Sequence, residues 1–536
     1  MQKSISLKLP PSEAVNELLV KEYIAKSEGV PFTDVSGYTI LKRSIDARGK
    51  QAWINLTLQA FIKEPYKQRE LLSFQFKQIN HAEKKVIVVG AGPAGLFAAL
   101  KLIELGIKPI ILERGKDVRA RRRDLAALNK EGEINPESNY CFGEGGAGTY
   151  SDGKLYTRSS KRGDITRILN LFVHFGAEEN ILYEAHPHIG TNKLPQIITA
   201  MRKTIVHCGG EFLFEKKVVD LVINNAKITG VKTSDECSFE SDAVILATGH
   251  SARDIFQLLY AKKIQIEAKP FALGVRVEHP QALIDSSQYH CAIRSEFLPP
   301  ASYSLVQQVE GNGVFSFCMC PGGIIAPAAT SPGELVVNGW SPSKRNNPYA
   351  NSGIVVTVQN HDLQTAENYA DFEDVCNQPR NVLRTELGMM YFQQYVERKA
   401  FLAGGGKFVA PAQRMVDFTK TKVSTSLPDC SYPPGLRSNC LKEVLPGFIH
   451  TSLQQAFIAF GKKMKGYFTN ESVVVATESR TSSPVRIPRD PISLQHPQIE
   501  NLYPCAEGAG YAGGIVSAAM DGERVAAQIA GILVRN

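Results

Sequence analysis

The spacing of hydrophobic positions near the start of the chain predicts a small mixed unit. Residues 37–48 and 52–62 alternate hydrophobic and polar positions, which is typical of strands that bury one face. Another strand is predicted at 4–9, and Pro11 marks the start of a helix after it. We therefore expect a βαββ domain over residues 1–82.

A different pattern begins beyond this unit. Residues 86–89 form a continuous hydrophobic run, typical of a strand buried on both faces, and the apolar stretch 96–105 predicts a helix after it. Short strands are predicted over 204–249. This order indicates an α/β fold with a Rossmann-type domain. Residues 83–265 form the first part of that domain.

The amino-acid composition and the predicted elements change again between residues 266 and 465. Proline and glycine become frequent, and a β-type run at 353–358 is mixed with a helical stretch at 382–398. We expect an inserted α+β domain that carries or caps a substrate. The run 472–477 and the segment that follows predict a return to the first domain over 466–536.

Glycines after the 86–89 run indicate a nucleotide site. Gly90 permits a tight turn, Gly92 permits close approach of a pyrophosphate, and Gly95 permits close packing of helix on strand. Glu113 ends the next predicted strand, where its carboxylate can accept both ribose hydroxyls and repel a 2′-phosphate. The pattern predicts a dinucleotide other than NADP.

Further segments favour FAD over NAD. Residues 143–154 form a loop of small residues that can pass beneath a flavin ring, and 247–249 follow an apolar strand. Glu507 precedes a second glycine-rich turn and an alanine-rich helix, whose N-terminus can face the pyrimidine edge of a flavin. A second glycine-rich segment near the C-terminus is not needed by an NAD enzyme. We therefore predict non-covalently bound FAD.

The basic run 119–123 has two interpretations, a solvated helix face or a phosphate contact. The residues expected to contact FAD are Gly90, Gly92, Pro93, Ala94, Gly95, Glu113, Arg114, Arg122, Gly145, Gly146, Ala147, Gly148, Thr149, Ser151, Asp152, Lys154, Val218, Ala247, Thr248, Gly249, Glu507, Gly508, Gly513, Gly514 and Ile515.

Six longer runs carry a resemblance to a known family, at residues 113–118, 145–155, 270–279, 317–323, 478–487 and 507–514. The chain resembles the glutathione-reductase-type FAD/NAD(P)-binding superfamily. Within it, the chain is similar to a bacterial family of FAD-dependent dehydrogenases, most of which lack an assigned substrate. The resemblance covers residues 84–536 and implies FAD, a Rossmann-type domain and an inserted second domain. Glu507 stands where most of the superfamily has Asp, and its extra methylene still reaches the ribityl chain.

Several polar residues are candidates for chemistry beside the flavin. Glu478, Arg480, Ser482 and Ser483 lie just before the segment of Glu507, and Arg480 can stabilise an anionic substrate or reduced flavin. The alternative is a structural Arg–Glu pair.

A histidine and a cysteine pair complete this set. His279 can shuttle a proton or be a buried structural residue. Cys320, with Cys318 two positions earlier, can place a thiol near the substrate or remain an inert buried thiol.

Composition adds few restrictions. The 61 Lys and Arg against 53 Asp and Glu give a formal net charge of +8, which does not by itself imply nucleic acid. Ten cysteines without disulfide-type spacing favour reduced thiols and a cytoplasmic location. We predict no metal site, no signal peptide and no membrane span. The oligomeric state is not predicted.

These observations favour an FAD-dependent oxidoreductase that moves hydride between flavin and a small organic substrate. A dedicated NAD(P)H domain is not expected. Reduction is then expected from the substrate, from NAD(P)H docking in the same cavity, or from a protein partner. One alternative is a flavin-dependent RNA-modifying enzyme, with RNA delivered by the basic residues of hairpin 42–50. Another is a non-catalytic flavin-containing sensor or scaffold.

Overall fold

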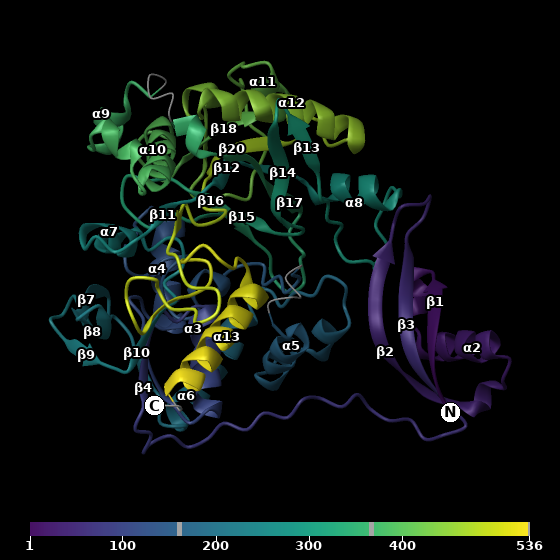
Figure 1. The fold of residues 1–536 in the computed structure, drawn as a ribbon. Helices are drawn as coiled ribbons and strands as arrows, with labels where there is room; N and C mark the ends of the chain where they lie inside the picture. The colour runs from purple at the N-terminus through teal and green to yellow at the C-terminus, as the bar shows by residue number, and fades with distance from the viewer. Residues whose placement is uncertain (158–162, 364–368, 534–536) are drawn as a thin grey trace.

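The computed structural model describes residues 1–157, 163–363 and 369–533. Three regions are distinct in Figure 1: an N-terminal unit, a central body around α3 and α13, and a cap that contains α9 to α12. This arrangement confirms the predicted α/β fold class with a Rossmann-type domain, an inserted domain and a small N-terminal unit.

The N-terminal unit is a three-stranded antiparallel sheet in the order β1-β3-β2. Alternating positions of β3 are buried, as their spacing predicts. Asn16 begins helix α2 because its side chain accepts hydrogen bonds from two backbone N–H groups. The elements are β1 (Gln2–Leu9), α1 (Pro11–Ala14), α2 (Glu17–Glu28), β2 (Val35–Asp46) and β3 (Trp53–Ile62).

The N-terminal unit is joined to the body by backbone as well as by its linker. The N–H of Arg43 donates to the carbonyl of Tyr183 at 2.8 Å, and the N–H of Ala185 donates back to Arg43 at 2.9 Å. Phe74 and Phe76 of the linker pack on His174. The linker runs along the base of the body in Figure 1.

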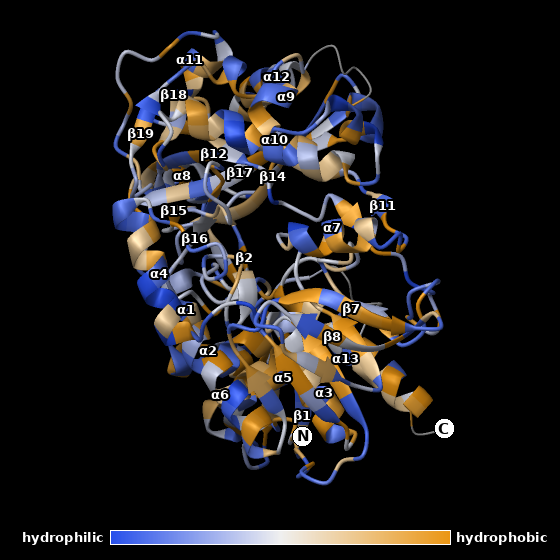
Figure 2. Ribbon diagram, turned by 90° about the vertical axis from the view of Figure 1, so that its left-hand side faces the viewer, coloured by the Kyte–Doolittle hydropathy of each residue, from blue (hydrophilic) through white to orange (hydrophobic). Residues whose placement is uncertain are grey.

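The body is built on a five-stranded parallel sheet in the order β22-β10-β4-β5-β6. Helices α3 and α13 pack on each other beside it, and Figure 2 shows hydrophobic residues gathered on both. The strands are β4 (Lys85–Val89), β5 (Lys108–Leu112), β6 (Glu211–Leu213), β10 (Ala243–Leu246) and β22 (Leu502–Pro504). The helices are α3 (Pro93–Glu104), α4 (Val118–Glu131), α5 (Ile165–His174), α6 (Leu194–His207), α7 (Arg253–Ala261) and α13 (Ile515–Leu533). An antiparallel sheet contains β7 (Val218–Asn224), β8 (Lys227–Thr233) and β9 (Ser238–Glu240).

The cap is organised around a seven-stranded sheet in the order β13-β14-β17-β12-β20-β18-β19. Its strands are β12 (Phe271–Pro280), β13 (Val306–Val309), β14 (Asn312–Cys320), β17 (Tyr349–Val358), β18 (Ala410–Arg414), β19 (Leu436–Ser438) and β20 (Val473–Glu478). Its helices are α8 (Gln281–Tyr289), α9 (Phe372–Cys376), α10 (Gly388–Ala403), α11 (Met415–Thr419) and α12 (Gly447–Lys463).

One part of the predicted chain path is wrong. The run 472–477 was expected to return to the first domain, but β20 pairs with β12 and β18 in the cap sheet. Every residue of β20 is buried, so its hydrophobic run has the same pattern as a parallel core strand of the body. The chain rejoins the parallel sheet only at β22.

Two short antiparallel pairs lie beside the cap sheet. They are β15 (Ile324–Pro327) with β16 (Val337–Trp340), and β11 (Glu267–Ala268) with β21 (Val485–Arg486). Figure 1 shows the cap above the body, with β15 and β16 at its lower edge.

Candidate functional site

A cavity lies at the carboxyl edge of the parallel sheet, where the cap covers it. Val89, Leu112 and Ala247, which end or follow three parallel strands, line one wall, and Phe317, Trp340 and Arg480 of the cap line the other. Ligands of open parallel sheets bind at this edge.

Most of the residues predicted to contact a cofactor line this cavity. They are Gly90, Gly92, Pro93, Ala94, Glu113, Arg114, Gly146, Ala147, Gly148, Ser151, Asp152, Lys154, Val218, Ala247, Thr248, Gly249, Glu507, Gly514 and Ile515. The remaining ones, Gly95, Arg122, Gly145, Thr149, Gly508 and Gly513, are outside the lining.

Two glycines of the first turn are required by packing. Gly90 has φ +102°, and a Cβ there would lie 2.5 Å from the carbonyl oxygen of Ala247. A Cβ at Gly95 would lie 2.0 Å from the carbonyl oxygen of Gly90. A side chain at either position would therefore collide with backbone, so both glycines are needed for the close approach of β4, α3 and the segment after β10.

Other glycines leave the cavity open. A Cβ at Gly92 would have only the Cα of Gly146 for a neighbour, at 4.0 Å, and at Gly249 or Gly514 it would meet no protein atom within 4 Å. The buried Thr248 hydroxyl has no hydrogen-bond partner in the described part of the protein and lines the same space. An extended dinucleotide fits this set, because bare backbone and an unpaired hydroxyl both face it.

Glu113 ties together three segments at the nucleotide end of the cavity. Its buried carboxylate accepts hydrogen bonds from the backbone N–H groups of Ala91, Gly115 and Gly143, each at 2.9 Å. A carboxylate has about four acceptor positions, so one remains for a ribose hydroxyl. Glu113 therefore has two roles: it holds the backbone of the site in place, and it can bind a ligand.

The arginines of the basic run divide by helix face. Arg122 is exposed on α4, whereas Arg121 is fully buried. Arg121 donates to the carbonyl oxygens of Asn139, Glu144 and Gly146 at 2.7, 2.9 and 2.9 Å. The buried Arg121 thus orders the loop that lines the cavity, whereas Arg122, the residue predicted to contact FAD, faces solvent.

The other end of the cavity is partly anionic. The Glu507 carboxylate is partly exposed, and its Oε2 lies 3.5 Å from Nδ1 of His250. His250 follows the predicted turn 247–249 and also lines the cavity, but nothing in its local pattern distinguished it. The pair places one carboxylate and one imidazole beside the N-terminus of α13.

The predicted catalytic group around Glu478 is mainly structural. Glu478 is fully buried and accepts a hydrogen bond from Arg276 at 2.7 Å, outside the cavity lining. The Ser483 hydroxyl donates to the carbonyl of Val485, and Ser482 is also outside the lining. The structural Arg–Glu alternative therefore holds for Glu478, with Arg276 as its partner.

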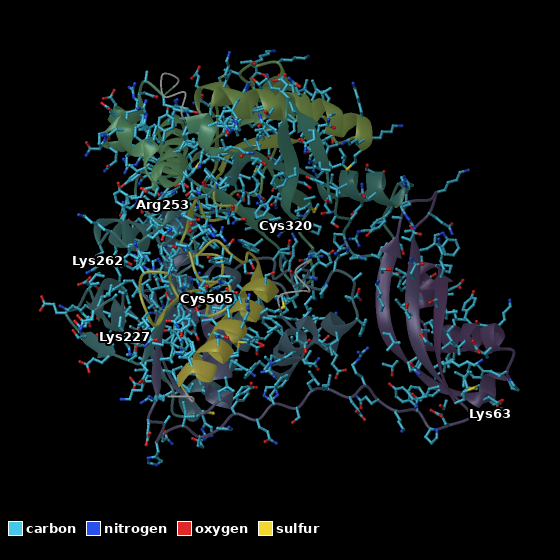
Figure 3. The ribbon with its side chains drawn as sticks, viewed as in Figure 1. Lys63, Lys227, Arg253, Lys262, Cys320 and Cys505 are labelled. Atoms are coloured by element: carbon cyan, nitrogen blue, oxygen red, sulfur yellow. The ribbon has the colours of Figure 1, made fainter. Side chains whose placement is uncertain are left out.

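Arg480 reaches the cavity but is already paired. Its guanidinium bonds Glu334 and Glu397 at 3.0 Å each. Arg253 of α7 bonds Glu397 as well, at 2.9 Å, so the cluster fastens the body to the cap. Burial opposes ionisation of Glu397, but Arg253 and Arg480 outweigh it and lower its pKa to about 2. Figure 3 shows Arg253 at the boundary between body and cap.

His279 lies away from the cavity. It is fully buried in β12, and its Nε2 lies 2.8 Å from the carbonyl oxygen of Tyr467. Burial lowers its pKa to about 4, so the ring is neutral at physiological pH and donates this hydrogen bond. The buried structural alternative therefore describes His279.

The two cysteines of β14 differ in position. Cys320 is buried outside the cavity lining, whereas Cys318 lines the cavity. Lys154 of the predicted flavin loop approaches Cys318, with 4.0 Å between Nζ and Sγ. Of the two thiols, Cys318 therefore reaches the cavity, whereas Cys320, the predicted candidate, lies outside its lining.

Comparison with known proteins identifies the family. Residues 84–259 match the pyridine nucleotide-disulphide oxidoreductase family, and 270–481 match the FAD-dependent protein, C-terminal domain-like family. Residues 1–61 match a domain of unknown function. An uncharacterised protein of Clostridium beijerinckii is 39% identical over 532 residues, which cover 95% of each chain.

This chain belongs to the bacterial FAD-dependent dehydrogenase family. FAD is the cofactor of this oxidoreductase family, and the open glycine-lined cavity fits it.

Other proteins match over a smaller part of the chain or at lower similarity. A tRNA uridine 5-carboxymethylaminomethyl modification enzyme from Alkaliphilus metalliredigens is 30% identical over 190 residues, which cover 35% of this chain and 27% of that enzyme. Among solved structures, 2,6-dihydroxypyridine-3-hydroxylase from Arthrobacter nicotinovorans matches at a TM-score of 0.37 and 9% identity, over 84% of each chain.

Within residues 1–157, 163–363 and 369–533, no helix is both long and apolar enough to span a membrane. No group of three or more His, Cys, Asp or Glu side chains in these ranges has a metal-binding arrangement.

Proposed function

We propose that this protein transfers hydride between FAD and a small organic substrate inside the cavity between body and cap. The observation that carries the proposal is the composition of the two walls. Bare backbone of Gly92, Gly249 and Gly514 faces the cavity from the body, and Phe317 and Trp340 cover it from the cap. Such a largely apolar space, covered by the cap on one side, limits the contact of a reduced flavin and its substrate with water.

The chain supplies binding and orientation. We assign the nucleotide end to Glu113 and the turn after β4, and the ring end to the 146–154 loop, Glu507 and the start of α13. The helix N-termini of α3 and α13 add partial positive charge at the two ends. FAD itself supplies hydride and electron chemistry when it is bound.

The side chains available near the substrate come mainly from the cap and from the loop after β10. Asn338, Trp340 and His250 line the cavity with polar atoms, and Nε2 of His250 is buried without a hydrogen-bond partner among the described residues. An imidazole with a free ring nitrogen can hold or release one proton as hydride leaves or arrives. We therefore assign proton transfer to His250 rather than to His279.

We do not extend the proposal to RNA. Two of the four basic residues of the hairpin already have acidic partners, with Arg48 bound to Asp46 at 2.8 Å and Arg43 3.7 Å from Glu184. The tRNA-modifying relative matches only about a third of this chain. A salt-dependent binding measurement with single-stranded RNA tests this, since phosphate contacts weaken steeply with salt.

Anaerobic stopped-flow mixing of the purified holoprotein with NADH and with NADPH tests the function. Loss of flavin absorbance with either one identifies a nicotinamide as the reductant docking in the cavity. If neither NADH nor NADPH bleaches the flavin, the electrons come from the organic substrate or from a protein partner. A correctly folded, colourless protein that ignores added FAD would contradict the proposal.

A further inference from the structure

Strand β14 carries an irregularity at its cavity end. Phe317 pairs with Gly353 and Cys320 pairs with Asn351, so three steps on β14 match two on β17. Cys318 within this bulge has φ +48°, a left-handed conformation that residues other than glycine rarely adopt. Such outliers persist where the surrounding structure enforces them, and they gather at functional sites.

The bulge separates the environments of two cysteines while keeping them close. Cys318 lines the cavity, and Cys320 is fully buried behind it. The sulfur of Cys320 lies 3.2 Å from the carbonyl oxygen of Cys318 and within hydrogen-bonding reach of the Cys318 sulfur. Figure 3 shows Cys320 at the lower end of the cap sheet, facing the body.

Positive charge surrounds the pair. Arg276, fully buried, donates to the carbonyl of Cys318 at 2.7 Å and approaches Sγ of Cys320 at 3.6 Å. Lys154 lies 4.0 Å from Sγ of Cys318. Of the nearby carboxylates, Glu478 pairs with Arg276, and Asp152 bonds Arg345 at 2.8 Å while it lies 3.8 Å from Lys154.

Positive groups outnumber carboxylates around the pair. Three cations, Arg276, Lys154 and Arg345, face the carboxyl groups of Glu478 and Asp152. Burial raises the pKa of Glu478 to about 7 although Arg276 opposes this, so the excess is at least one positive charge. A thiolate at Cys318 offsets it. The Cys320 hydrogen bond, with help from Lys154 and Arg276, holds the pKa of Cys318 well below its usual range although burial opposes this. The same bond and burial raise the pKa of Cys320.

The geometry is that of an attacking thiolate with a second thiol behind it. We propose that Cys318 and Cys320 are a redox-active dithiol–disulfide pair in the cap, which exchanges two electrons with the flavin bound in the same cavity. Oxidation of the Cys318 thiolate and the Cys320 thiol forms one S–S bond and releases two electrons and one proton, the equivalent of a hydride, which would reduce bound FAD to its anionic reduced form. The reverse transfer would break the S–S bond and restore the thiolate and the thiol. The link to flavin rests on the proposed function, but the pair itself does not.

The first experiment examines the pair alone. Full-length protein is equilibrated anaerobically in buffers of rising oxidised-to-reduced glutathione ratio, quenched in acid, alkylated and mapped by mass spectrometry. We expect the peptide that contains Cys318 and Cys320 to lose two hydrogen atoms, to resist alkylation, and to recover both thiols when the ratio is reversed. A peptide that stays fully alkylated at every ratio overturns the proposal, and this arm needs no variant.

Single variants separate the two roles. Cys320→Ser leaves Cys318 without its partner, so we expect a stable mixed disulfide of glutathione at Cys318. Cys318→Ser leaves only the buried thiol, which should take no glutathione. Cys376→Ser is the matched control, because Cys376 is a buried cap cysteine on α9, and it should behave as the wild type. Equal glutathione adducts in the Cys318→Ser and Cys320→Ser variants would overturn the assignment.

A reductive titration connects the pair to the flavin. Fully oxidised wild-type holoprotein should consume twice as many dithionite electrons per flavin as the Cys320→Ser holoprotein, since disulfide and flavin each take two. Equal consumption overturns the exchange. A protein that holds no flavin but still loses two hydrogens in glutathione buffer contradicts the proposed function and leaves the thiol pair standing. A yellow protein whose two cysteines never form a disulfide overturns the thiol-pair proposal and leaves the proposed function standing.

Discussion

The two walls of the cavity are built from different materials. On the body side, the turns after β4, β10 and β22 present backbone, and glycines such as Gly92 leave that backbone uncovered. On the cap side, buried ionic side chains such as Arg276 and Arg480 hold the wall together. The body wall leaves room for a ligand because its glycines have no side chains. The cap wall keeps its shape because its buried charged side chains form ion pairs with one another.

This difference determines how each wall responds to change. A new methyl group at Gly92 of the body wall meets the ligand rather than the protein, so it affects binding first. A lost charge on the cap wall leaves its partner buried and unpaired, which costs folding free energy first. The comparison is therefore tested by variants that separate cofactor affinity from stability.

The largest effect is expected from Glu397→Gln. Glu397 is a carboxylate that Arg253 of the body and Arg480 of the cap share, so removing its charge leaves two largely buried guanidiniums to share the carboxylate of Glu334. Breaking a buried ion pair costs about 3–5 kcal/mol. We expect a loss of that size in the free energy of unfolding, measured by urea denaturation followed by circular dichroism.

Exposed Glu386 provides the control for that measurement. Glu386→Gln makes the same chemical change at the surface and should stay within about 0.5 kcal/mol of wild type. If both variants unfold at the same urea concentration, the cluster does not fasten the cap to the body.

The same contrast explains what could be predicted from sequence. The body wall was predictable because the positions of Gly90, Gly95 and Glu113 follow from local strand–turn–helix geometry. The strand β20 was misassigned because a continuous hydrophobic run indicates burial on both faces but not which sheet receives it. Partner choice of this kind depends on pairing across about 200 residues, as between Arg276 and Glu478.

A pH-dependent loss of stability is the next effect. Burial lowers the pKa of His279 to about 4, below its ordinary value of 6.5. The unfolded chain therefore binds more protons between these values, so this stabilisation is complete above pH 6.5 and is lost as the pH falls toward 4. The shift corresponds to about 3 kcal/mol. His279→Gln should reduce the difference between urea midpoints at pH 7 and pH 4.5.

The exposed His361 is the matched control for this pH effect, because its side chain is 71% exposed. His361→Gln should keep the full pH dependence of the wild type. His188 and His450, whose pKa values burial also lowers to about 4, contribute to the pH dependence that remains in His279→Gln. An unchanged pH dependence in His279→Gln would mean that this ring is not buried neutral.

The body wall is tested by Gly92→Ala. The added Cβ would lie 4.0 Å from its nearest protein neighbour, so the apoprotein should fold as before. With FAD bound, the methyl group occupies space that the cofactor needs, and overpacking costs about 1–3 kcal/mol. We expect roughly 10–100-fold weaker FAD binding by calorimetric titration of apoprotein. Gly447→Ala, also free of neighbours within 4 Å but on α12 of the cap, should bind as wild type.

Helix periodicity contains information about the arginine run that a charge count does not. Val118, Arg121, Leu125 and Leu128 are spaced three or four residues apart and form the buried face of α4. The position of Arg121 in this hydrophobic stripe was therefore readable from the sequence. The hydrogen-bond partners of Arg121 could not be predicted, because the carbonyl oxygens that it binds belong to a loop more than fifteen residues away.

The smallest effect is expected from Arg122→Gln. Arg122 is exposed on α4 and outside the cavity lining, so its charge is screened by solvent and should contribute little to phosphate binding. We expect FAD affinity within about twofold of wild type and stability within about 0.5 kcal/mol. Arg121→Gln provides the contrast, because it withdraws several donors from buried carbonyl oxygens and should disorder the loop that holds the flavin. If Arg122→Gln instead weakens FAD binding tenfold while Arg121→Gln does not, the exposed arginine contacts the phosphates and the division by helix face fails.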